Sequence, residues 1–526
     1  MKHHYLDNLN YDINRVLTLL DRNKFSSTYG CFDRNYWHLK IKDFTSGMSQ
    51  EFVFILAHAY KLSNSNNRFY NNKNLLDYVK AGIKYAEKSS NKDGSANDYY
   101  PFERALGATC FSLYAFSESC LLLDLDSEEF LPFFIKRVKW MLNSNETGLL
   151  SNHHAIVALS IYNIYLLSGD EYYKNESEKI ITKIISWQNS EGWYPEYGGC
   201  SIGYLSVTID FLAQYYLKTL NAELYDSLVQ AIKFFSDTQH PDGTCGGDYD
   251  VRHVSIFHPN GFEIMGSFYS PATQVANSFL RAKAENLLTN TNDDYIFGHS
   301  IISNINAYIN CNRDNYNLLN AKKTKIANKF YENSSIYICH NNMFWSIFNL
   351  NKGGTGKIYK NNKLIYSDAG IIVKINDQIL ISSLKNIETD FKLNKLGFNL
   401  TTDLKPLKQY HPNSLIFLMF RFFLFLFGKL KYSSSIVRSL LQKKLIYNNK
   451  KSGLRLTKNF YFKEDNIVIE TIIDGNLSGF KEASRATELV PIYTAVSECF
   501  QEPLINLNWQ VMPMKNNRLI LEEKII

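Results

Sequence analysis

The sequence lacks several features that would assign a protein class at once. Its eight cysteines show no CxxC spacing, so a thiolate metal cluster is not expected. No long Lys/Arg block and no nucleic-acid-binding motif occur, which argues against DNA or RNA as a partner. The N-terminus has no continuous apolar run of the kind that a secretory signal requires. These absences predict a cytoplasmic protein that needs no metal and no cofactor.

Proline is also scarce, with 11 residues in a chain of 526. Hydrophobic residues make up 45% and charged residues 21%, which is ordinary for a folded, soluble protein. The length predicts two or three domains rather than one core. The net charge of +6 is mildly basic and is compatible with an anionic ligand or an anionic membrane surface, without requiring either.

Amphipathic helices separated by glycine turns repeat along roughly the first 300 residues. The turns are Ser46-Gly47, Asp93-Gly94, Thr147-Gly148, Glu191-Gly192 and Asp242-Gly243. Each interval has room for two helices, for example Phe52–Lys61 with Leu75–Ser89, or Ala155–Leu167 with Glu176–Gln188. A period near 50 residues with two helices per unit predicts a curved helical array. Five or six such hairpins would close into an α/α toroid, although an open solenoid gives a similar pattern.

Short runs rich in Ile, Val, Tyr and Phe replace the helices after about residue 330. They are Ser335–His340, Met343–Leu350, Lys363–Asp368, Ile371–Ile375 and Gln378–Leu384, and Leu454–Phe462 with Ile467–Ile473 are typical of a hairpin. Many short strands with turns between them predict an antiparallel β-sandwich. We therefore expect an α/α toroid at residues 1–325 and a β-sandwich at 326–526, joined by an Asn-rich segment.

One segment, at about residues 413–446, breaks the β pattern. Leu415–Phe427 is almost continuously apolar, and Ile436–Leu445 is amphipathic and carries Arg438, Lys443 and Lys444. Thirteen residues span roughly 20 Å as a helix, short of the roughly 30 Å hydrocarbon core of a bilayer. Two interpretations stay open: an in-plane helix at the inner membrane surface, with its cations near lipid headgroups, and an insertion that packs on the sandwich or on a partner subunit.

Polar and aromatic residues gather in loops at equivalent points of the helical repeat. Three clusters follow the glycine turns: Ser151 to His154, Glu191 to Tyr204, and Asp248 to Glu263. Two earlier segments, Asp33 to Trp37 and Tyr99 to Arg104, occupy comparable places. Because equivalent points of a toroid lie on the same rim, we expect these loops to come together.

These residues carry a resemblance to a known family. Asn152-His153 at a helix start, Gly192-Trp193-Tyr194 in a turn and Gly203-Tyr204 farther on resemble the heparinase II/III and alginate lyase superfamily. Asp33–Trp37 and Gly261-Phe262-Glu263 are similar to segments of heparinase-like proteins from bacterial surface-polysaccharide clusters. The resemblance covers the whole chain in architecture and about residues 145 to 265 in motif. It implies a toroid catalytic domain followed by a sandwich, and a carbon–oxygen lyase acting on a uronate-containing polysaccharide or lipid-linked glycan.

The resemblance also implies roles for individual residues. Tyr204 would act as base, acid or both, with His153 as its partner. Neutralising the substrate carboxylate is a role for Asn152 with His153 or Arg252. Tyrosine has an ordinary pKa near 10, so adjacent positive charge from Arg252 or His253 would be needed for it to act as a base near neutrality. Tyr197 competes for the role of Tyr204. The remaining candidate substrate-binding residues are Trp37, Arg34, Glu103, Trp193, Tyr197 and His253.

Each candidate also has an ordinary structural alternative. Asn152 could be a helix N-cap, and His154 rather than His153 could line the cleft. Arg252 could pair with Asp248 or Asp250, and Glu103 could pair with Arg104. Both tryptophans could pack in the core instead of stacking on sugars.

Three other functions compete with the lyase. A uronyl C5-epimerase would use the same proton abstraction without expelling a leaving group. A toroid glycoside hydrolase in surface-polysaccharide biosynthesis would need two carboxylates about 5–10 Å apart, for which Asp33, Glu196, Asp248 and Glu263 are candidates. A glycan-binding protein would have no turnover. The sequence leaves the substrate and the oligomeric state open.

Overall fold

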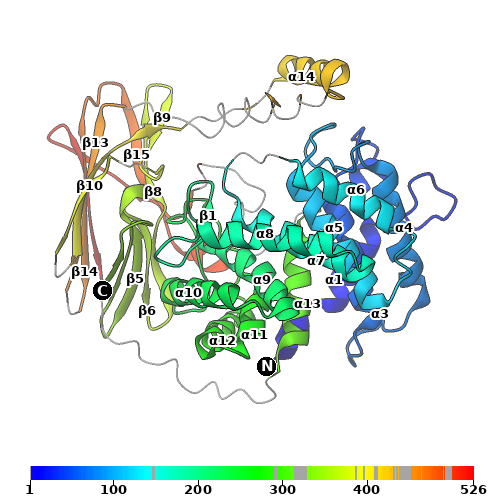
Figure 1. Ribbon diagram of the computed structural model, residues 1–526. Coiled ribbons are helices and arrows are strands. Elements are labelled where there is room, and N and C mark those ends of the chain that lie inside the picture. Colours follow the sequence, from blue (N-terminus) through cyan, green and yellow to red (C-terminus); the bar gives the residue numbers. More distant parts are fainter. Residues whose placement is uncertain are drawn as a thin grey trace.

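The computed structural model consists of a helical domain and a β-sheet domain lying side by side (Figure 1). It describes residues 2–144, 148–289, 294, 296–312, 328–385, 388–394, 397–407, 411, 413–430, 433, 436–437, 452–463, 465–489, 491 and 500–526. The expected domain boundary between residues 325 and 326 lies outside this part of the chain. The same holds for residues 438–445 of the second amphipathic segment.

The helical domain is a closed ring. Its inner helices are α3 (Phe52–Lys61), α5 (Leu106–Leu123), α7 (Ser151–Ser168), α9 (Ile202–Thr219), α11 (Asn260–Gly266) and α13 (Phe297–Asn310). Each contacts the next, and α13 contacts α3. The inner helices α5 and α7 are apolar on almost every face, as expected for helices enclosed by others. The expected α/α toroid is therefore confirmed, and an open solenoid is excluded.

An outer layer of amphipathic helices surrounds the ring. It consists of α4 (Lys73–Ser89), α6 (Leu131–Leu142), α8 (Glu171–Trp187), α10 (Ala222–Thr238) and α12 (Ser270–Ala284). The N-terminal elements η1 (Lys2–Leu6) and α1 (Leu9–Leu19) complete it, since η1 contacts α12 and α13, and α1 contacts α3. The short helices α2 (Arg34–Trp37) and η2 (Met48–Glu51) precede α3.

The glycine turns join an outer helix to the next inner helix. At Gly192 (φ 107°) and Gly243 (φ 90°) the backbone is left-handed. A Cβ atom would collide with the carbonyl of Gln230 in α10 at the first site, and with that of Ser278 in α12 at the second. Gln188 and Gln239, just after α8 and α10, donate to the carbonyls of Gly192 and Gly243. The repeat seen in the sequence thus reflects a repeated packing geometry.

The β domain contains antiparallel sheets with an aromatic core. One sheet consists of β3 (Lys329–Tyr331), β4 (Ile336–His340), β5 (Phe344–Asn349), β6 (Thr355–Lys360) and β7 (Lys363–Asp368) in that order. A second has the order β10-β11-β13-β14-β18-β17, comprising Asp390–Asn394, Gly397–Asp403, Leu454–Phe462, Ile467–Gly475, Arg518–Ile525 and Met514–Lys515. Phe348 of β5 packs on Phe398 and Phe460 of β11 and β13, so these two sheets face each other. The expected sandwich is confirmed.

A third sheet completes this domain. Its order is β12-β9-β8-β15-β16, with bounds Lys405–Pro406, Gln378–Ile381, Gly370–Ile375, Phe480–Ala486 and Gln510–Val511. The short helices η3 (Leu350–Lys352) and η4 (Glu502–Asn506) lie in connecting segments. The apolar segment forms the predicted helix, α14 (Ser414–Phe427), which lies apart from the sheets in Figure 1.

Candidate functional site

The loops that precede the inner helices meet at one rim of the toroid. A short hairpin, β1 (Pro195–Glu196) with β2 (Gly199–Cys200), bridges to Leu150 just before α7. The next loop joins this hairpin, since the Val251 amide donates to the carbonyl of Cys200 over 3.3 Å. The loops of the second and third sequence clusters therefore lie against the start of α7, as expected from the repeat.

The two adjacent histidines of α7 face opposite layers of the toroid. The His153 ring lies edge-on to Phe111 of α5, with 6.2 Å between centroids, and a Cβ at Gly107 would lie 3.3 Å from its Cε1. His154 instead packs on Trp187 of the outer helix α8, with 4.8 Å between centroids. Successive helical residues point about 100° apart, which explains the divergence. His153 is therefore the histidine directed toward the inner ring.

Asn152 is not a helix N-cap. The helix begins at Ser151, and the Asn152 amide donates to Glu196 Oε2 across 2.8 Å. Both side chains are buried, with 1% and 3% of their surface exposed. Ser151 Oγ donates to the Pro195 carbonyl over 2.7 Å in parallel with this bond. The first turn of α7 is thus fixed to the β1–β2 hairpin by two side-chain hydrogen bonds.

The Arg252 side chain stacks on Tyr197. Its guanidinium carbon lies 3.9 Å from the centroid of the Tyr197 ring. Tyr197 is 36% exposed and has a left-handed backbone (φ 51°), whereas Arg252 is 7% exposed. The Arg252 backbone N–H donates to Asp250 Oδ1 over 2.7 Å. The pair forms a cationic and aromatic edge at the surface of the rim.

Tyr204 lies in the first turn of α9. It is half-buried and packs against the toroid core. Its helix start is capped from a distance, because Asp250 Oδ2 accepts from Ser201 Oγ over 3.0 Å and from the backbone N–H groups of Ile202 and Gly203. Asp250, two residues before Arg252, therefore fixes the start of the helix that carries Tyr204. Burial raises the pKa of Asp250 to about 6, and these hydrogen bonds oppose the rise.

A lysine from the sandwich holds the third rim loop. Lys352 Nζ donates to the carbonyls of Asp248 and Asp250, both over 2.6 Å, and lies 2.9 Å from His253 Nε2. Burial lowers the pKa of Lys352 to about 7, opposed by Asp248 and Asp250. Burial and then Lys352 lower the pKa of His253 to about 4. His253 is 4% exposed and is engaged in this contact, and its predicted role in substrate binding stays a prediction.

Sequence reasoning missed Lys352, and it also missed His299. His299, in the first turn of α13, lies 2.6 Å through Nδ1 from Glu51 Oε2 and stacks on Phe111, with 4.2 Å between centroids. Phe111 therefore lies between His153 and His299. His299 and His153 occupy the same position at the start of an inner helix. This shared position in the repeat could have identified His299 from the sequence.

The other predicted binding residues mostly serve packing. Trp193 is 8% exposed and its indole N–H donates to Glu191 over 2.7 Å, so it presents no open face to a sugar. Glu103 accepts from the backbone N–H groups of Asp98 and Tyr99, over 2.9 and 2.7 Å, and its predicted binding role stays a prediction. Arg104 pairs with Asp93 over 3.0 Å.

Arg34 and Trp37 lie together on α2 at the edge of the toroid. Both are half-buried, and the Trp37 indole N–H donates to the Leu19 carbonyl over 2.7 Å. The preceding residue, Asp33, accepts from the backbone N–H of Ser46, close to the start of η2. Their predicted binding roles stay predictions.

The four carboxylates considered for hydrolysis are buried in separate networks. Asp33 pairs with Lys42, Glu196 binds Asn152, Asp248 accepts from Leu489, and Glu263 accepts from Tyr5. All four are 9% exposed or less. Each of the four therefore has a partner inside the fold, and the hydrolase stays an alternative.

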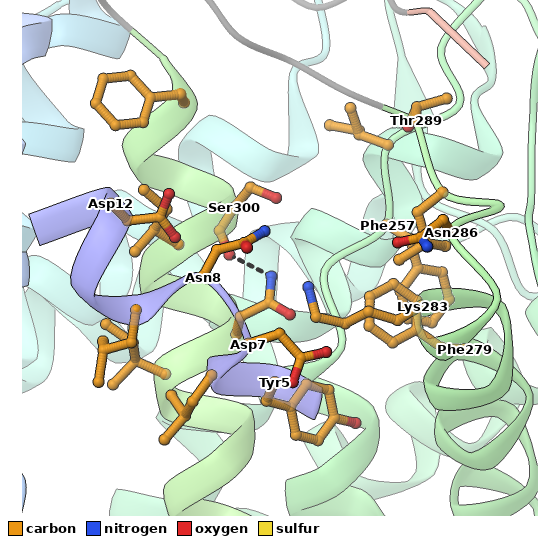
Figure 2. Close-up of a pocket in the computed structure, with 18 of the residues that line it drawn as sticks. Tyr5, Asp7, Asn8, Asp12, Phe257, Phe279, Lys283, Asn286, Thr289 and Ser300 are labelled. Carbon is orange, nitrogen blue, oxygen red and sulfur yellow. Dashed lines mark hydrogen bonds between the residues drawn. The ribbon is translucent and has the colours of Figure 1, made fainter. Parts of the chain in front are cut away.

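A cavity of about 530 Å³ opens elsewhere, between η1, α1, α12 and α13 (Figure 2). Lys283 extends into it from α12, near Asp7 and Asn8 (Figure 2). Burial raises the pKa of Asp12 to about 6, and Lys283 opposes the rise. None of the predicted site residues lines this cavity. We therefore place the candidate site at the rim, where the start of α7, the β1–β2 hairpin, the start of α9 and the loop of Asp250 are joined by hydrogen bonds.

Comparison with known proteins gives likeness in structure only. No protein-family model and no curated protein sequence matches the chain. The chondroitin AC lyase of Streptomyces coelicolor A3, solved with chondroitin sulphate, is similar with a TM-score of 0.56 and 8% identity, over 93% of this chain and 68% of that one. Heparinase III has a TM-score of 0.48 and 11% identity, over 84% and 64% of the two chains. The cellobiose 2-epimerase of Bacillus thermoamylovorans B4167 has a TM-score of 0.43 and 11% identity, over 57% and 97%.

Because the sequence identities are so low, these comparisons show a likeness of fold alone. The comparison with the chondroitin AC lyase carries that conclusion. The arrangement seen here is a toroid followed by an antiparallel sandwich. The inner helices of the toroid begin at a loop-rich rim, and the sandwich contacts this rim. The resemblance inferred from the sequence is thereby confirmed for the architecture. This chain has the fold of the α/α-toroid polysaccharide lyases.

Proposed function

We propose that this chain is a lyase that cleaves a uronate-containing glycan by proton abstraction and β-elimination at the toroid rim. The observation that carries the proposal is the clustering of three groups around the starts of α7 and α9. These are His153, the Asn152–Glu196 pair and the Tyr197–Arg252 pair. The lyase-like fold supports the same reaction class.

The elimination makes separate demands on the site. A base removes the proton alpha to the substrate carboxylate, and the electron pair of that C–H bond forms a C=C bond. The C–O bond to the neighbouring sugar then breaks, and an acid protonates the departing oxygen. Negative charge that builds up on the carboxylate must be stabilised throughout. We assign proton transfer to Tyr204 with His153, and stabilisation of the carboxylate to Arg252 with Asn152.

The surroundings of Arg252 support its assignment. Its guanidinium is almost fully buried against Tyr197, at a surface where the aromatic ring is open to solvent. A cation in a partly dehydrated setting attracts a carboxylate more strongly than an exposed one does. A planar guanidinium also binds a carboxylate through two parallel hydrogen bonds. Tyr197 stays the alternative proton-transfer residue because it contacts this cation.

The test is incubation of the purified protein with free and lipid-linked acidic oligosaccharides. Elimination creates an unsaturated uronate, which absorbs in the ultraviolet, and cleaves the chain without adding water. Tyr204→Phe and His153→Ala should each lower the rate by at least about 100-fold, the usual minimum contribution of a general acid or base. Tyr197→Phe, measured in parallel, decides between the two tyrosines.

His154→Ala is the matched control, because His154 neighbours His153 but packs outward on Trp187. It should leave the rate within a few-fold of the wild type. A product heavier by one water would indicate a hydrolase, and solvent deuterium incorporation without cleavage would indicate a C5-epimerase. Glycan binding that survives in every variant, without turnover in the wild type, would reject an enzymatic role.

A further inference from the structure

Helix α14 exposes almost its whole apolar surface. Of its large hydrophobic side chains, Leu424 alone is buried, at 2% exposed. Phe425 is 77% exposed and Phe422 62%. The other exposed members are Leu415, Ile416, Phe417, Leu418, Met419, Leu426 and Phe427. A continuous exposed apolar face of this kind marks an interaction surface.

The helix is held against the toroid with this face outward. Arg421 pairs with Asp43 over 2.6 Å, and Phe420 lies edge-on to Tyr100, with 5.5 Å between centroids. At the C-terminal end, Arg104 donates to the carbonyls of Gly428 and Lys429, over 3.1 and 3.2 Å. A guanidinium at a helix C-terminus is favourable because it meets the negative end of the helix dipole. The apolar face is thus presented in a fixed orientation.

The charge of the surrounding sequence indicates what this face meets. Residues 413–453, which contain the helix and precede β13, have eight Lys or Arg and no Asp or Glu. The rest of the chain has 49 basic and 51 acidic residues, so this one stretch supplies the whole positive net charge. Lys429, directly after the helix, is one of these cations. Cations beside an apolar helix suit an anionic phospholipid surface, where each contributes about 1 kcal/mol near the headgroups.

The length of α14 fits attachment to a bilayer surface rather than crossing. Its 14 residues span about 21 Å, less than the hydrocarbon thickness of about 30 Å. Within the described part of the chain, α5 is long and apolar enough to cross a bilayer, but 78% of it is buried within the ring. Its contacts with α3 and α7 identify it as a core helix.

We propose that α14 lies in the plane of an anionic phospholipid membrane and attaches the toroid to it. The exposed phenylalanines enter the interface, and the neighbouring lysines and arginines contact lipid phosphates. A protein partner could also cover an apolar face, but the acid-free cationic stretch favours lipid. The proposal stands independently of the enzymatic function, since it rests on residues outside the candidate site.

Flotation with lipid vesicles tests this proposal on the full chain. The wild type should float with vesicles of phosphatidylcholine plus phosphatidylglycerol, and bind much less to phosphatidylcholine alone. Added salt should weaken this binding, because it screens the attraction between cations and headgroups. The double variant Phe422→Ser/Phe425→Ser should bind at least about tenfold more weakly, since each buried phenylalanine contributes well over a factor of ten.

Phe25→Ser is the matched control, because Phe25 is fully exposed but lies in the loop between α1 and α2 instead of on α14. It should bind vesicles like the wild type. Equal binding by wild type and double variant would overturn the proposal, as would failure of the wild type to float at low salt. A wild-type dimer that the double variant converts to monomer, without vesicle binding, would also overturn it and assign the face to a second copy. Equal binding to both vesicle types would overturn the preference for anionic lipid.

Discussion

At the toroid rim, Lys352, His253 and Asp250 are enclosed between the two domains, whereas along α14 Phe422 and Phe425 lie open to solvent. Each arrangement reverses the ordinary distribution of charged and apolar groups. The buried rim groups find their partners inside the chain: Lys352 binds two carbonyls, and Asp250 binds the start of α9. Phe422 and Phe425 of α14, in contrast, keep most of their surface exposed. The rim is therefore a region whose buried groups are satisfied within the protein. The α14 face is a region whose apolar groups need an external surface.

Replacing Lys352 should produce the largest loss of stability. Lys352→Met would leave the carbonyls of Asp248 and Asp250 without their buried donor, and removing one member of a buried charged cluster costs about 3–5 kcal/mol. Urea unfolding measures this loss. Lys363→Met is the control, because Lys363 is exposed, and should change stability by less than about 0.5 kcal/mol. Equal stability of the two variants would mean that the contacts of Lys352 do not stabilise the rim.

Acid should weaken the same cluster. The pKa of His253 is lowered to about 4 in the fold, chiefly by burial, against an ordinary value of 6.5. A lowered pKa contributes stability that is full above 6.5 and is lost as the pH falls through 4, by about 3 kcal/mol in total. His253→Asn removes this contribution and tolerates the left-handed backbone at this position (φ 56°).

The measurement compares urea unfolding of wild type and His253→Asn across this pH range. The difference between the two proteins isolates His253 from Asp250, whose raised pKa acts in the opposite direction. The wild type should lose stability more steeply on acidification. Parallel pH profiles of the two proteins would show that the fold does not lower the pKa of His253.

Breaking the contact between α7 and the β1–β2 hairpin should have a smaller effect. Asn152→Ala removes the amide that donates to buried Glu196, which costs about 2 kcal/mol for a hydrogen bond to a charged group. A double-mutant cycle with Glu196→Ala should give a coupling energy of about 1–2 kcal/mol. Additive effects would show that the two side chains do not interact in solution.

The smallest effect is expected on α14. Phe425→Ser should change the free energy of unfolding by less than about 0.5 kcal/mol, because the side chain is 77% exposed and contributes little packing. Thermal unfolding is a sufficient measurement. A loss of more than about 1 kcal/mol would indicate that this face is covered in the free protein, and the contrast with the rim would disappear.

The sequence predicts elements well where the pattern is local. The hairpin Leu454–Phe462 with Ile467–Ile473 matches β13 and β14 almost to the residue, because both strands alternate regularly. The helix Phe52–Lys61 matches α3. Strand β6 was not predicted, since Gly356 and two lysines hide its alternation. One of these, Lys357, is buried and contacts Gln501 over 3.1 Å instead of facing solvent.

The candidate site was predicted only in part, for a physical reason. Their positions in the repeat place His153, Tyr197 and Arg252 on one rim. These positions do not identify which side chains are engaged by contacts inside the protein and which are left for a substrate. Trp193 and His253 are engaged by Glu191 and Lys352, and Lys352 belongs to another domain. Contacts between residues about 100 positions apart leave no local pattern in the chain.

The contact between α3 and α13 has a consequence for how the protein is made. These helices are separated by more than 230 residues, so the ring stays open on the ribosome until α13 has emerged. Until then, η1, with its buried side chains Tyr5 and Leu6, lacks α13, one of the helices that it contacts. Synthesis proceeds at about 5–20 residues per second, so these side chains lack this cover for at least about ten seconds. The N-terminal turn therefore reaches its final packing only when the last inner helix has been made.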